Sequence, residues 1–320
     1  MRWTLLSYLL LALPGCGGDL ADLDADGLSG RLSFTRTLHD DVANSRYGVA
    51  VADLDTGTTR WIASPRVVWG DRTSLSRDGT TVAWQQAGAD FDGYRLHTKV
   101  VDGGAATPLE VDDTGHHHMP TWSADGSRLW YAGAEGLTSV AAEGGSPTVE
   151  VPMAWSWTSV SPDGAWLLYT SGTSDDPSGL LRAPLVALDA VELLVPLTVS
   201  VGPRRAEWSP TMDRIAWLMD HDANDENTAE SDWRYELWTM DLGTMEPELL
   251  VELPLAAHIS ETALAWSPDG TQIAFDWAPG TSESGGGSAI HVVDVATAEV
   301  RRITSWEHDD SAPSWSVLPD

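Results

Sequence analysis

Cysteine is nearly absent from this sequence: Cys16 is the only one in 320 residues. A single cysteine has no partner for an internal disulfide, so packing and hydrogen bonds alone must hold the fold. Cys16 follows an apolar stretch directly, which points to a role for its thiol other than cross-linking.

Basic residues are also scarce. The chain has 18 Lys and Arg against 48 Asp and Glu, a formal net charge of −30, and Lys99 is its only lysine. A field of this sign repels nucleic acid and anionic membrane surfaces, so neither is an expected partner. It favours cations, basic proteins and cationic peptides, although solubility alone would also account for such a charge.

Long hydrophobic runs are missing too, since none approaches the ~20 residues of a transmembrane helix. The apolar run from Leu5 to Leu13 has the length of a signal-peptide core, and Arg2 precedes it. Residues 1–15 are therefore predicted to be a signal peptide that directs export.

The end of this run, Leu13-Pro14-Gly15-Cys16, resembles the bacterial lipobox, although Pro14 departs from the small residue usual there. We expect Cys16 to be the lipid attachment site and residues 16–29 a lipidated acidic tether. Gly17, where retained lipoproteins often have Asp, favours an outer-membrane lipoprotein that faces the periplasm or the cell surface. The lipid anchor is then its one contact with a membrane.

A twelve-residue unit recurs along the remaining chain, and its clearest copy is LAWSPDGTQIAF from Leu264. Further copies begin at Thr73, Pro120, Thr158 and Ala206. In each copy a serine precedes an aromatic residue at a constant offset, and these motif serines pair as Ser76 with Trp84, Ser123 with Tyr131, Ser161 with Tyr169, Ser209 with Trp217 and Ser267 with Phe275. Five identical offsets indicate a structural repeat.

The unit is typical of a β-hairpin. In Ser-Pro-Asp-Gly, Pro has the φ that a turn requires, Asp caps turn amides, and Gly accepts a positive φ. Thr211-Met212 replaces Asp-Gly in the copy from Ala206, so its turn is expected to be looser. Two more short strands follow each hairpin, and four strands per repeat are typical of propeller blades.

The chain ends complete the count of blades. Pro313–Ser316 looks like a first strand with nothing after it, and 31–34 like a second strand with no first. Residues 47–57 and 58–63 supply a third and a fourth strand. The predicted fold is all-β: one six-bladed β-propeller over residues 30–320, with four-stranded antiparallel blades, closed by one C-terminal strand that joins three N-terminal strands.

These W-S-P-D-G…I-A-F units resemble the WD-like Asp-box repeats of TolB-type propellers, and the resemblance covers nearly all of residues 30–317. It implies the propeller fold and says little about function. The α/β domain that precedes the propeller in TolB is expected to be absent, because residues 16–29 leave no room for it.

First strands line the channel of a propeller, so residues just before them ring one mouth. Counting back from the motif serines predicts a ligand-binding mouth of Asp71, Arg72, His117, His118, Trp157, Arg204, Arg205, Glu261 and Asp310. Adjacent arginines such as Arg204 and Arg205 grip carboxylates well. Alternatively, the two arginines form a structural ion pair with an acid such as Asp310.

Two segments suggest metals. His116, His117 and His118 could supply zinc or manganese ligands, although neighbours on an extended chain point to opposite faces. Asp22, Asp24 and Asp26 match the first half of a calcium loop, but Ser33 stands where such a loop has glutamate. A polar loop and a solvated tether are the plainer interpretations, so no cofactor is expected apart from possible calcium.

The sequence favours a binding module over an enzyme, since it contains no G-x-S-x-G nucleophile elbow. We expect a monomeric envelope lipoprotein that binds an envelope protein or peptide at the channel mouth. The alternative is a metal-dependent lyase or hydrolase that acts on an anionic saccharide and uses the His116–His118 region.

Overall fold

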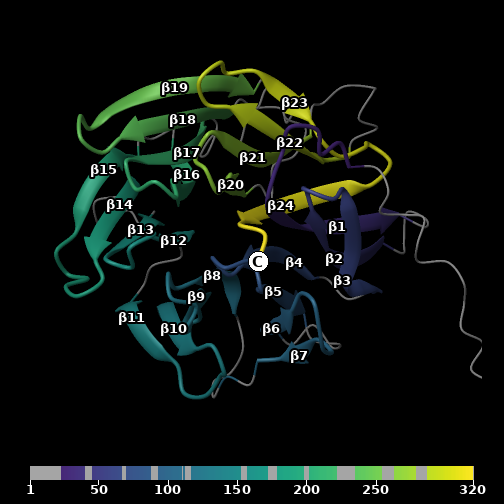
Figure 1. The fold of residues 1–320 in the computed structure, drawn as a ribbon. Helices are drawn as coiled ribbons and strands as arrows, with labels where there is room; N and C mark the ends of the chain where they lie inside the picture. Colours follow the sequence, from purple (N-terminus) through teal and green to yellow (C-terminus); the bar gives the residue numbers. More distant parts are fainter. Residues whose placement is uncertain are drawn as a thin grey trace, which may run out of the picture.

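The computed structural model describes residues 23–39, 45–66, 70–87, 93–109, 111, 117–152, 157–171, 179–197, 202–221, 235–253, 263–278 and 287–319. These residues form six four-stranded antiparallel sheets, arranged as blades around a central axis (Figure 1). Within this part of the chain every regular element is a strand. The prediction of a six-bladed all-β propeller is confirmed.

The blades follow the chain in order. Blade 1 contains β24 (Asp309–Ser316), β1 (Arg31–His39), β2 (Ser45–Asp53) and β3 (Thr58–Arg66). Blade 2 contains β4 (Gly70–Leu75), β5 (Thr81–Ala87), β6 (Tyr94–Val100) and β7 (Thr107–Pro108), and blade 3 contains β8 (His118–Trp122), β9 (Arg128–Gly133), β10 (Gly136–Ala141) and β11 (Thr148–Pro152).

Blade 4 contains β12 (Thr158–Val160), β13 (Trp166–Ser171), β14 (Gly179–Pro184) and β15 (Glu192–Pro196). Blade 5 contains β16 (Gly202–Trp208), β17 (Arg214–Asp220), β18 (Tyr235–Asp241) and β19 (Glu246–Leu253), and blade 6 contains β20 (Leu264–Trp266), β21 (Gln272–Trp277), β22 (Ala289–Asp294) and β23 (Val300–Arg302).

The core lies between the blades rather than in one central mass. Each of six clusters of buried apolar side chains joins two neighbouring blades, and together they link the blades in a closed ring. Blade 1, for example, packs on blade 6 through Phe34 and Ile290 and on blade 2 through Val51 and Trp84. Blades 2 and 5 therefore lie opposite each other across the axis.

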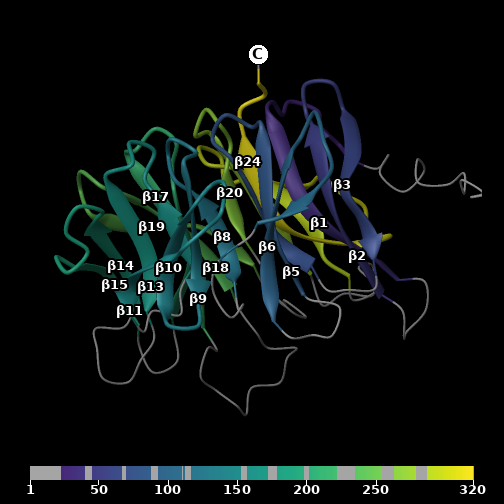
Figure 2. The ribbon, with the colours of Figure 1, turned by 90° about the horizontal axis from the view of Figure 1, so that it is seen from below.

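The motif turns join the first and second strands of a blade on one side of the ring, which we call the turn face. The C-terminal end of the chain rises from this face (Figure 2), where the carbonyl of Val317 lies close to Gly79. We call the opposite side, where the first strands begin, the entry face.

The turn of blade 3 shows why the motif folds this way. Ser123 Oγ donates to Asp125 Oδ1 at 2.7 Å and accepts from the Arg128 amide at 2.9 Å, and Gly126 has a φ of 69°. Hydrogen bonds from Ser127 and Ser123 lower the pKa of Asp125 to about 2. The turns that follow Ser76, Ser161 and Ser267 repeat this arrangement.

The turn of blade 5 has the same backbone, so the expectation that it is looser is wrong. The Ser209 amide donates to Arg214 O at 2.9 Å, and the Met212 amide donates to Ser209 O at 3.0 Å. Met212 adopts a φ of 68°, which glycine adopts in the other turns. Blade 5 therefore keeps the turn at the cost of a left-handed methionine.

Tryptophans one residue before the motif serines fasten neighbouring first strands. Trp122 Nε1 donates to Ser74 O of the preceding blade at 3.0 Å, and Trp208 Nε1 donates to Ser159 O at 3.1 Å. The Trp266 indole donates in the same way to Glu207 O at 3.3 Å. A buried indole N–H needs an acceptor, and each of these three finds one on the preceding blade.

Ring closure joins the two ends of the chain. Strand β24 pairs antiparallel with β1 in blade 1, as predicted, and begins at Asp309, earlier than the predicted Pro313. Arg36 on β1 binds Asp310 on β24 through two contacts of 2.7 Å, and both side chains are fully buried.

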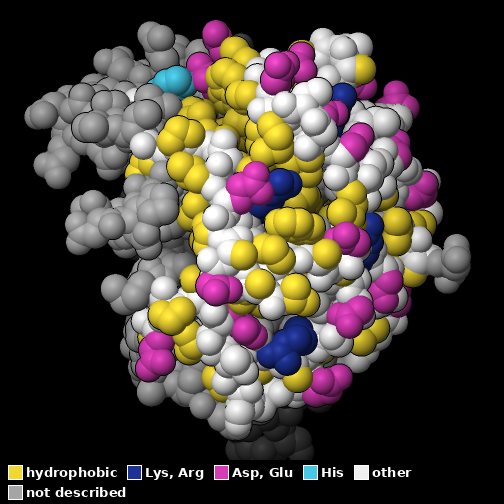
Figure 3. Space-filling model, turned by 90° about the vertical axis from the view of Figure 1, so that its left-hand side faces the viewer, with side chains coloured by type: hydrophobic (Ala, Val, Ile, Leu, Met, Phe, Trp, Pro, Cys, Tyr) yellow, Lys and Arg dark blue, Asp and Glu magenta, His cyan; other side chains and the backbone are white. Residues whose placement is uncertain are grey.

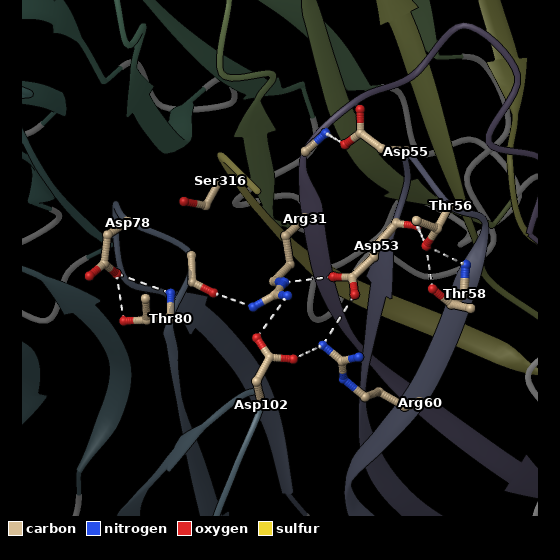
Figure 4. A network of polar contacts seen from close by, with 12 residues as sticks. Arg31, Asp53, Asp55, Thr56, Thr58, Arg60, Asp78, Thr80, Asp102 and Ser316 are labelled. Atoms are coloured by element: carbon tan, nitrogen blue, oxygen red, sulfur yellow. Dashed lines mark hydrogen bonds and ion pairs between the residues drawn. The ribbon is translucent and has the colours of Figure 1, made fainter. Parts of the chain in front are cut away.

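A second ionic network secures the turn-face end of this junction (Figure 4). Buried Arg31 on β1 contacts Asp53 at 2.6 Å and Asp102 of blade 2 at 3.1 Å, and it donates to Gly79 O at 2.8 Å. Arg60 contacts the same two aspartates. Blades 1 and 2 are thus joined by charge as well as by apolar packing.

Candidate functional site

The central channel contains a cavity of about 500 Å³. The first strands of all six blades line it, from Arg72, Met119 and Trp157 near the entry face to Arg77, Pro210 and Val317 near the turn face. A cavity of this size on the axis lies in the range of ligand pockets.

Four of the six first strands begin with a bulge at the entry face. Arg72, Met119 and Arg205 stand four residues before a motif serine, Ala312 stands four residues before Ser316, and all four have a φ between 51° and 57°. The strand register shifts at each of these positions. A bulge redirects the side chains around it, which here gathers residues of different blades over the end of the channel.

Three of the predicted mouth residues meet at this end. The guanidinium carbon of Arg72 lies 4.1 Å from the centre of the Trp157 ring, and that of Arg205 lies 4.7 Å from it. Arg72 comes from blade 2 and Arg205 from blade 5, on the opposite side of the axis. The indole of Trp157, from blade 4, therefore lies across the entry-face end of the channel, held by two cation–π contacts.

Asp276 on β21 fixes two of the first strands near the cluster of Trp157, Arg72 and Arg205. Its Oδ1 accepts hydrogen bonds from the amides of Ala263 at 2.9 Å and Ala312 at 3.2 Å, which fixes the start of two first strands. Burial raises the pKa of Asp276 to about 6, and the positive charge of Arg205 and the two amides oppose that rise. Gln85 holds the Met119 amide in the same way at 2.8 Å.

At the turn-face end, Arg77 reaches across the channel. Its Nη2 lies 3.5 Å from Pro210 O, so a blade 2 side chain meets the turn of blade 5 on the far side of the axis. The cavity thus lies between Trp157 at one end and Arg77 at the other.

A ring of mostly polar side chains surrounds the cavity between these ends. Its members stand two residues before the motif serines and before Ser316, which occupies the corresponding place in blade 1: Ser74, Thr121, Ser159, Glu207, Ala265 and Ser314. The same alignment that located the mouth would have located this ring, because −2 and −4 positions share a face of a regular strand.

Glu207 is the acidic member of this ring, and sequence reasoning missed it. Ser159 Oγ donates to Glu207 Oε2 at 2.6 Å. Burial raises the pKa of the Glu207 carboxyl group to about 8, and the hydrogen bond from Ser159 opposes that rise. The channel therefore holds a carboxyl group that keeps its proton at neutral pH when no ligand is bound.

The structure distributes the other predicted mouth residues elsewhere. Arg204 is exposed, whereas its neighbour Arg205 is buried, so the two do not act as a pair. Asp310 is fully buried against Arg36 and is not presented at the mouth. Asp310 therefore pairs with Arg36 and not with Arg204 or Arg205, and it stabilises the closure of the ring. The side chain of Asp71 and the whole of Glu261 lie outside the described residues.

The histidines of the predicted metal segment separate. His117 is buried with its ring 4.8 Å from that of Tyr131, and His118 lies 4.6 Å from Tyr94. His116 lies outside the described residues. Among the residues that are described, no three His, Cys, Asp or Glu side chains are grouped as metal ligands would be.

The predicted calcium segment is described only in part. Asp24 Oδ1 accepts a hydrogen bond from the Asp26 amide at 3.1 Å, and Arg301 lies 3.5 Å from the Asp24 carboxylate. Asp22 lies outside the described residues, as do the predicted signal peptide and Cys16. In the part of the chain that is described, no helix is long and apolar enough to cross a membrane.

Six blades around a lined channel define the class of this protein as a six-bladed β-propeller. TolB from Acinetobacter baumannii shares the fold with a TM-score of 0.69 at 14% identity, over 90% of this chain and 66% of that protein. Putative TolB from Agrobacterium tumefaciens gives a TM-score of 0.57 at 13% identity, over 86% of this chain and 89% of that one. The chain therefore has the propeller fold that these TolB proteins share.

The same fold also occurs in an enzyme. A prolyl endopeptidase gives a TM-score of 0.52 at 15% identity, over 89% of this chain and 49% of that one. No family model and no curated protein matches the sequence. Because identities this low establish the fold alone, function has to be argued from the channel.

Proposed function

We propose that this chain is an envelope-anchored lipoprotein whose propeller binds a segment of a protein or peptide in its central channel. The cavity of about 500 Å³ carries this proposal, because first strands from all six blades line it. It combines apolar walls with a ring of polar groups that could orient a bound segment.

The cluster of Trp157, Arg72 and Arg205 at the entry face supports the same function. The two guanidinium groups stack over the Trp157 ring, and Trp and Arg are the residue types that most often dominate the energetics of protein interfaces. A partner that approaches from this face meets Trp157 before it meets the polar ring.

The surface charge supports a partner that is neutral or basic. Asp and Glu side chains are scattered over the side of the ring seen in Figure 3, and Lys and Arg are few there. With a net charge of −30, the chain attracts basic partners over long range and speeds their encounter.

A variant that fills the cavity tests this function. Thr121 lines the cavity and is only partly buried, so Thr121→Trp should occupy the channel with little effect on the core. We expect soluble protein starting at Gly17 to capture an envelope protein or peptide, and the variant to lose this capture. Val186→Trp, at a site 96% exposed, is the matched control. Equal capture by Thr121→Trp and wild type would exclude the channel as the site.

We do not propose the metal-dependent lyase or hydrolase. His117 and His118 pack on different tyrosines, so a reaction through both would require them to leave their present contacts. Elemental analysis of the purified protein is the direct test, and one tightly held zinc or manganese ion per chain would support the hypothesis of a metal-dependent enzyme.

The envelope anchor is proposed from the sequence of the first sixteen residues. Cys16→Ser should abolish labelling by radioactive palmitate and release the protein from the membrane fraction. Retention of the label in this variant would rule out Cys16 as the attachment site.

A further inference from the structure

Glu207, which is partly exposed in the channel, differs from the buried aspartates of the described structure. Asp53 contacts Arg31, Asp310 contacts Arg36, and Asp276 lies within the field of Arg205. The carboxyl group of Glu207 instead receives one hydrogen bond, from a neutral serine. A desolvated carboxylate without a counter-charge is costly, so the ionised form of Glu207 would be stabilised by a cation from outside the fold.

The surroundings of Glu207 suit an organic cation. Trp122, Trp208 and Trp266 border the same cavity but are buried between the blades. This apolar surrounding lowers the local dielectric constant and strengthens the pairing of a carboxylate with a cation. The serines and the threonine of the polar ring supply oxygen acceptors for the remaining N–H groups.

Other cations fit less well. A divalent metal requires several anionic or carbonyl ligands, and Glu207 is the single carboxylate of the ring. A guanidinium binds best to both oxygens of a carboxylate in a planar, bidentate geometry. The hydrogen bond from Ser159 to Glu207 Oε2 competes with that geometry, whereas an ammonium group needs a single oxygen.

We propose that Glu207 and Ser159 form a subsite in the channel for an organic ammonium group of the bound segment, supplied by a lysine side chain or by a free amino terminus. This inference rests on the proposed function, since it names the chemistry that the channel recognises. It also fits a chain of net charge −30 that attracts basic partners.

Binding at this subsite is an exchange of one cation for another. The protonated carboxyl group of Glu207 releases its proton to solvent, and the resulting carboxylate pairs with the ammonium group. The described lining contains two further positive side chains, Arg72 and Arg77, and one further negative, Asp78. Its net charge is +1 both before and after the exchange, so the exchange adds no uncompensated charge to the cavity.

The exchange predicts a pH dependence of fixed sign. Below the pKa of about 8 for Glu207, binding must displace the proton, so affinity for a lysine ammonium group should rise about tenfold per pH unit from pH 6 and level off above pH 8. Affinity for a terminal ammonium group should rise in the same way but fall again above pH 8, because that group then loses its own proton. About one proton should be released per ligand at pH 7. A ligand that accepts a hydrogen bond from protonated Glu207 would show the opposite trend.

Three short peptides test the inference by titration calorimetry in two buffers of different ionisation enthalpy. Acetyl-Gly-Lys-Gly-amide offers only a side-chain ammonium, Gly-Gly-Gly-amide offers only a terminal one, and acetyl-Gly-Lys(acetyl)-Gly-amide offers neither. We expect one of the first two to bind with proton release, which identifies the source, and the third to bind at least about tenfold more weakly.

Variants then locate the subsite. Glu207→Gln should weaken binding of the ammonium peptide at least about tenfold and remove its pH dependence, whereas Glu248→Gln, at an exposed position on β19, should change neither. Ser159→Ala removes the hydrogen bond that favours the carboxylate, so the rise in affinity should move to higher pH. Thermal melting of each variant shows that it is folded.

The outcomes separate this inference from the proposed function. Equal binding of the acetylated peptide, no binding of either ammonium peptide, or unchanged binding by Glu207→Gln would each refute the ammonium subsite. If Thr121→Trp abolishes capture of a partner while Glu207→Gln captures it normally, the binding module stands and the subsite does not. If no partner is captured at all, the proposed function fails.

Discussion

In the described part of the propeller, three buried aspartates lie beside arginines, and one glutamate in the channel lies beside a serine. The difference has a consequence for stability, because the folded protein keeps a proton on Glu207 that the unfolded chain releases. Burial raises the pKa of Glu207 from the ordinary 4.5 to about 8. Stability tied to this proton is present in full below pH 4.5 and is lost as the pH rises to about 8.

We therefore predict that Glu207→Gln gains stability over the wild type as the pH rises. The two proteins should differ least near pH 4, and the variant should be more stable by about 3 to 5 kcal/mol at pH 9. Urea unfolding at a series of pH values measures the difference. The control Glu248→Gln should show no such trend, and a constant offset between wild type and Glu207→Gln would contradict the raised pKa.

At the scale of the elements, the motif turn explains how much of the fold the sequence reveals. Serine, aspartate and glycine at fixed offsets act within six residues, and such local chemistry survives in the sequence as a readable pattern. The turn at Met212 could not be predicted from these motif residues. Packing between blades imposes the same backbone turn even where the glycine is missing, and the local sequence does not reveal this packing.

Replacing this methionine by glycine should stabilise the protein. Met212 has a φ of 68°, a conformation that costs a residue with a Cβ about 1 kcal/mol, so Met212→Gly should raise the free energy of unfolding by about 0.5 to 1 kcal/mol. The reverse change, Gly270→Ala in blade 6, should lower it by about 1 kcal/mol, since that turn has a φ of 73°. Changes of the same sign in both variants would refute this account.

The bulge in the first strands explains why the mouth was predicted only in part. Residues Ser311 and Ser314 pair with Thr35 and Ser33, so β24 contains one residue more than β1 in this stretch. Positions before the bulge therefore turn to the other face. Asp310 moves from the expected mouth to Arg36, whereas Glu207, after the bulge in β16, keeps the regular alternation and faces the channel.

At the scale of the whole molecule, the ion pair of Arg36 and Asp310 joins strands from the two ends of the chain. Both side chains are fully buried, so removal of one leaves the other charged and unpaired. Asp310→Ala should lower the free energy of unfolding by about 3 to 5 kcal/mol. Arg36→Met combined with Asp310→Leu should recover most of this loss, because apolar residues replace both charges.

A partly exposed pair provides the comparison. Arg182 and Glu192 lie 2.8 Å apart on the outside of blade 4, with Glu192 46% exposed, so Arg182→Ala should cost no more than about 1 kcal/mol. Chemical denaturation of all four proteins measures these differences. A loss in Asp310→Ala no larger than in Arg182→Ala would show that the closure pair does not hold the ring.

The pairing of β24 with β1 also sets the order in which the molecule can fold. Arg36 and Asp310 are 274 residues apart, so their contact closes nearly the longest loop the chain can form. The chain loses conformational entropy when this loop closes, and the stabilising contacts form only afterwards. We therefore expect this step to be slow. Blades 2 to 6 can each assemble from adjacent strands, whereas blade 1 has to wait for the last strand. Until it arrives, β1 is an open edge, and the kinetic hazard of aggregation is concentrated there.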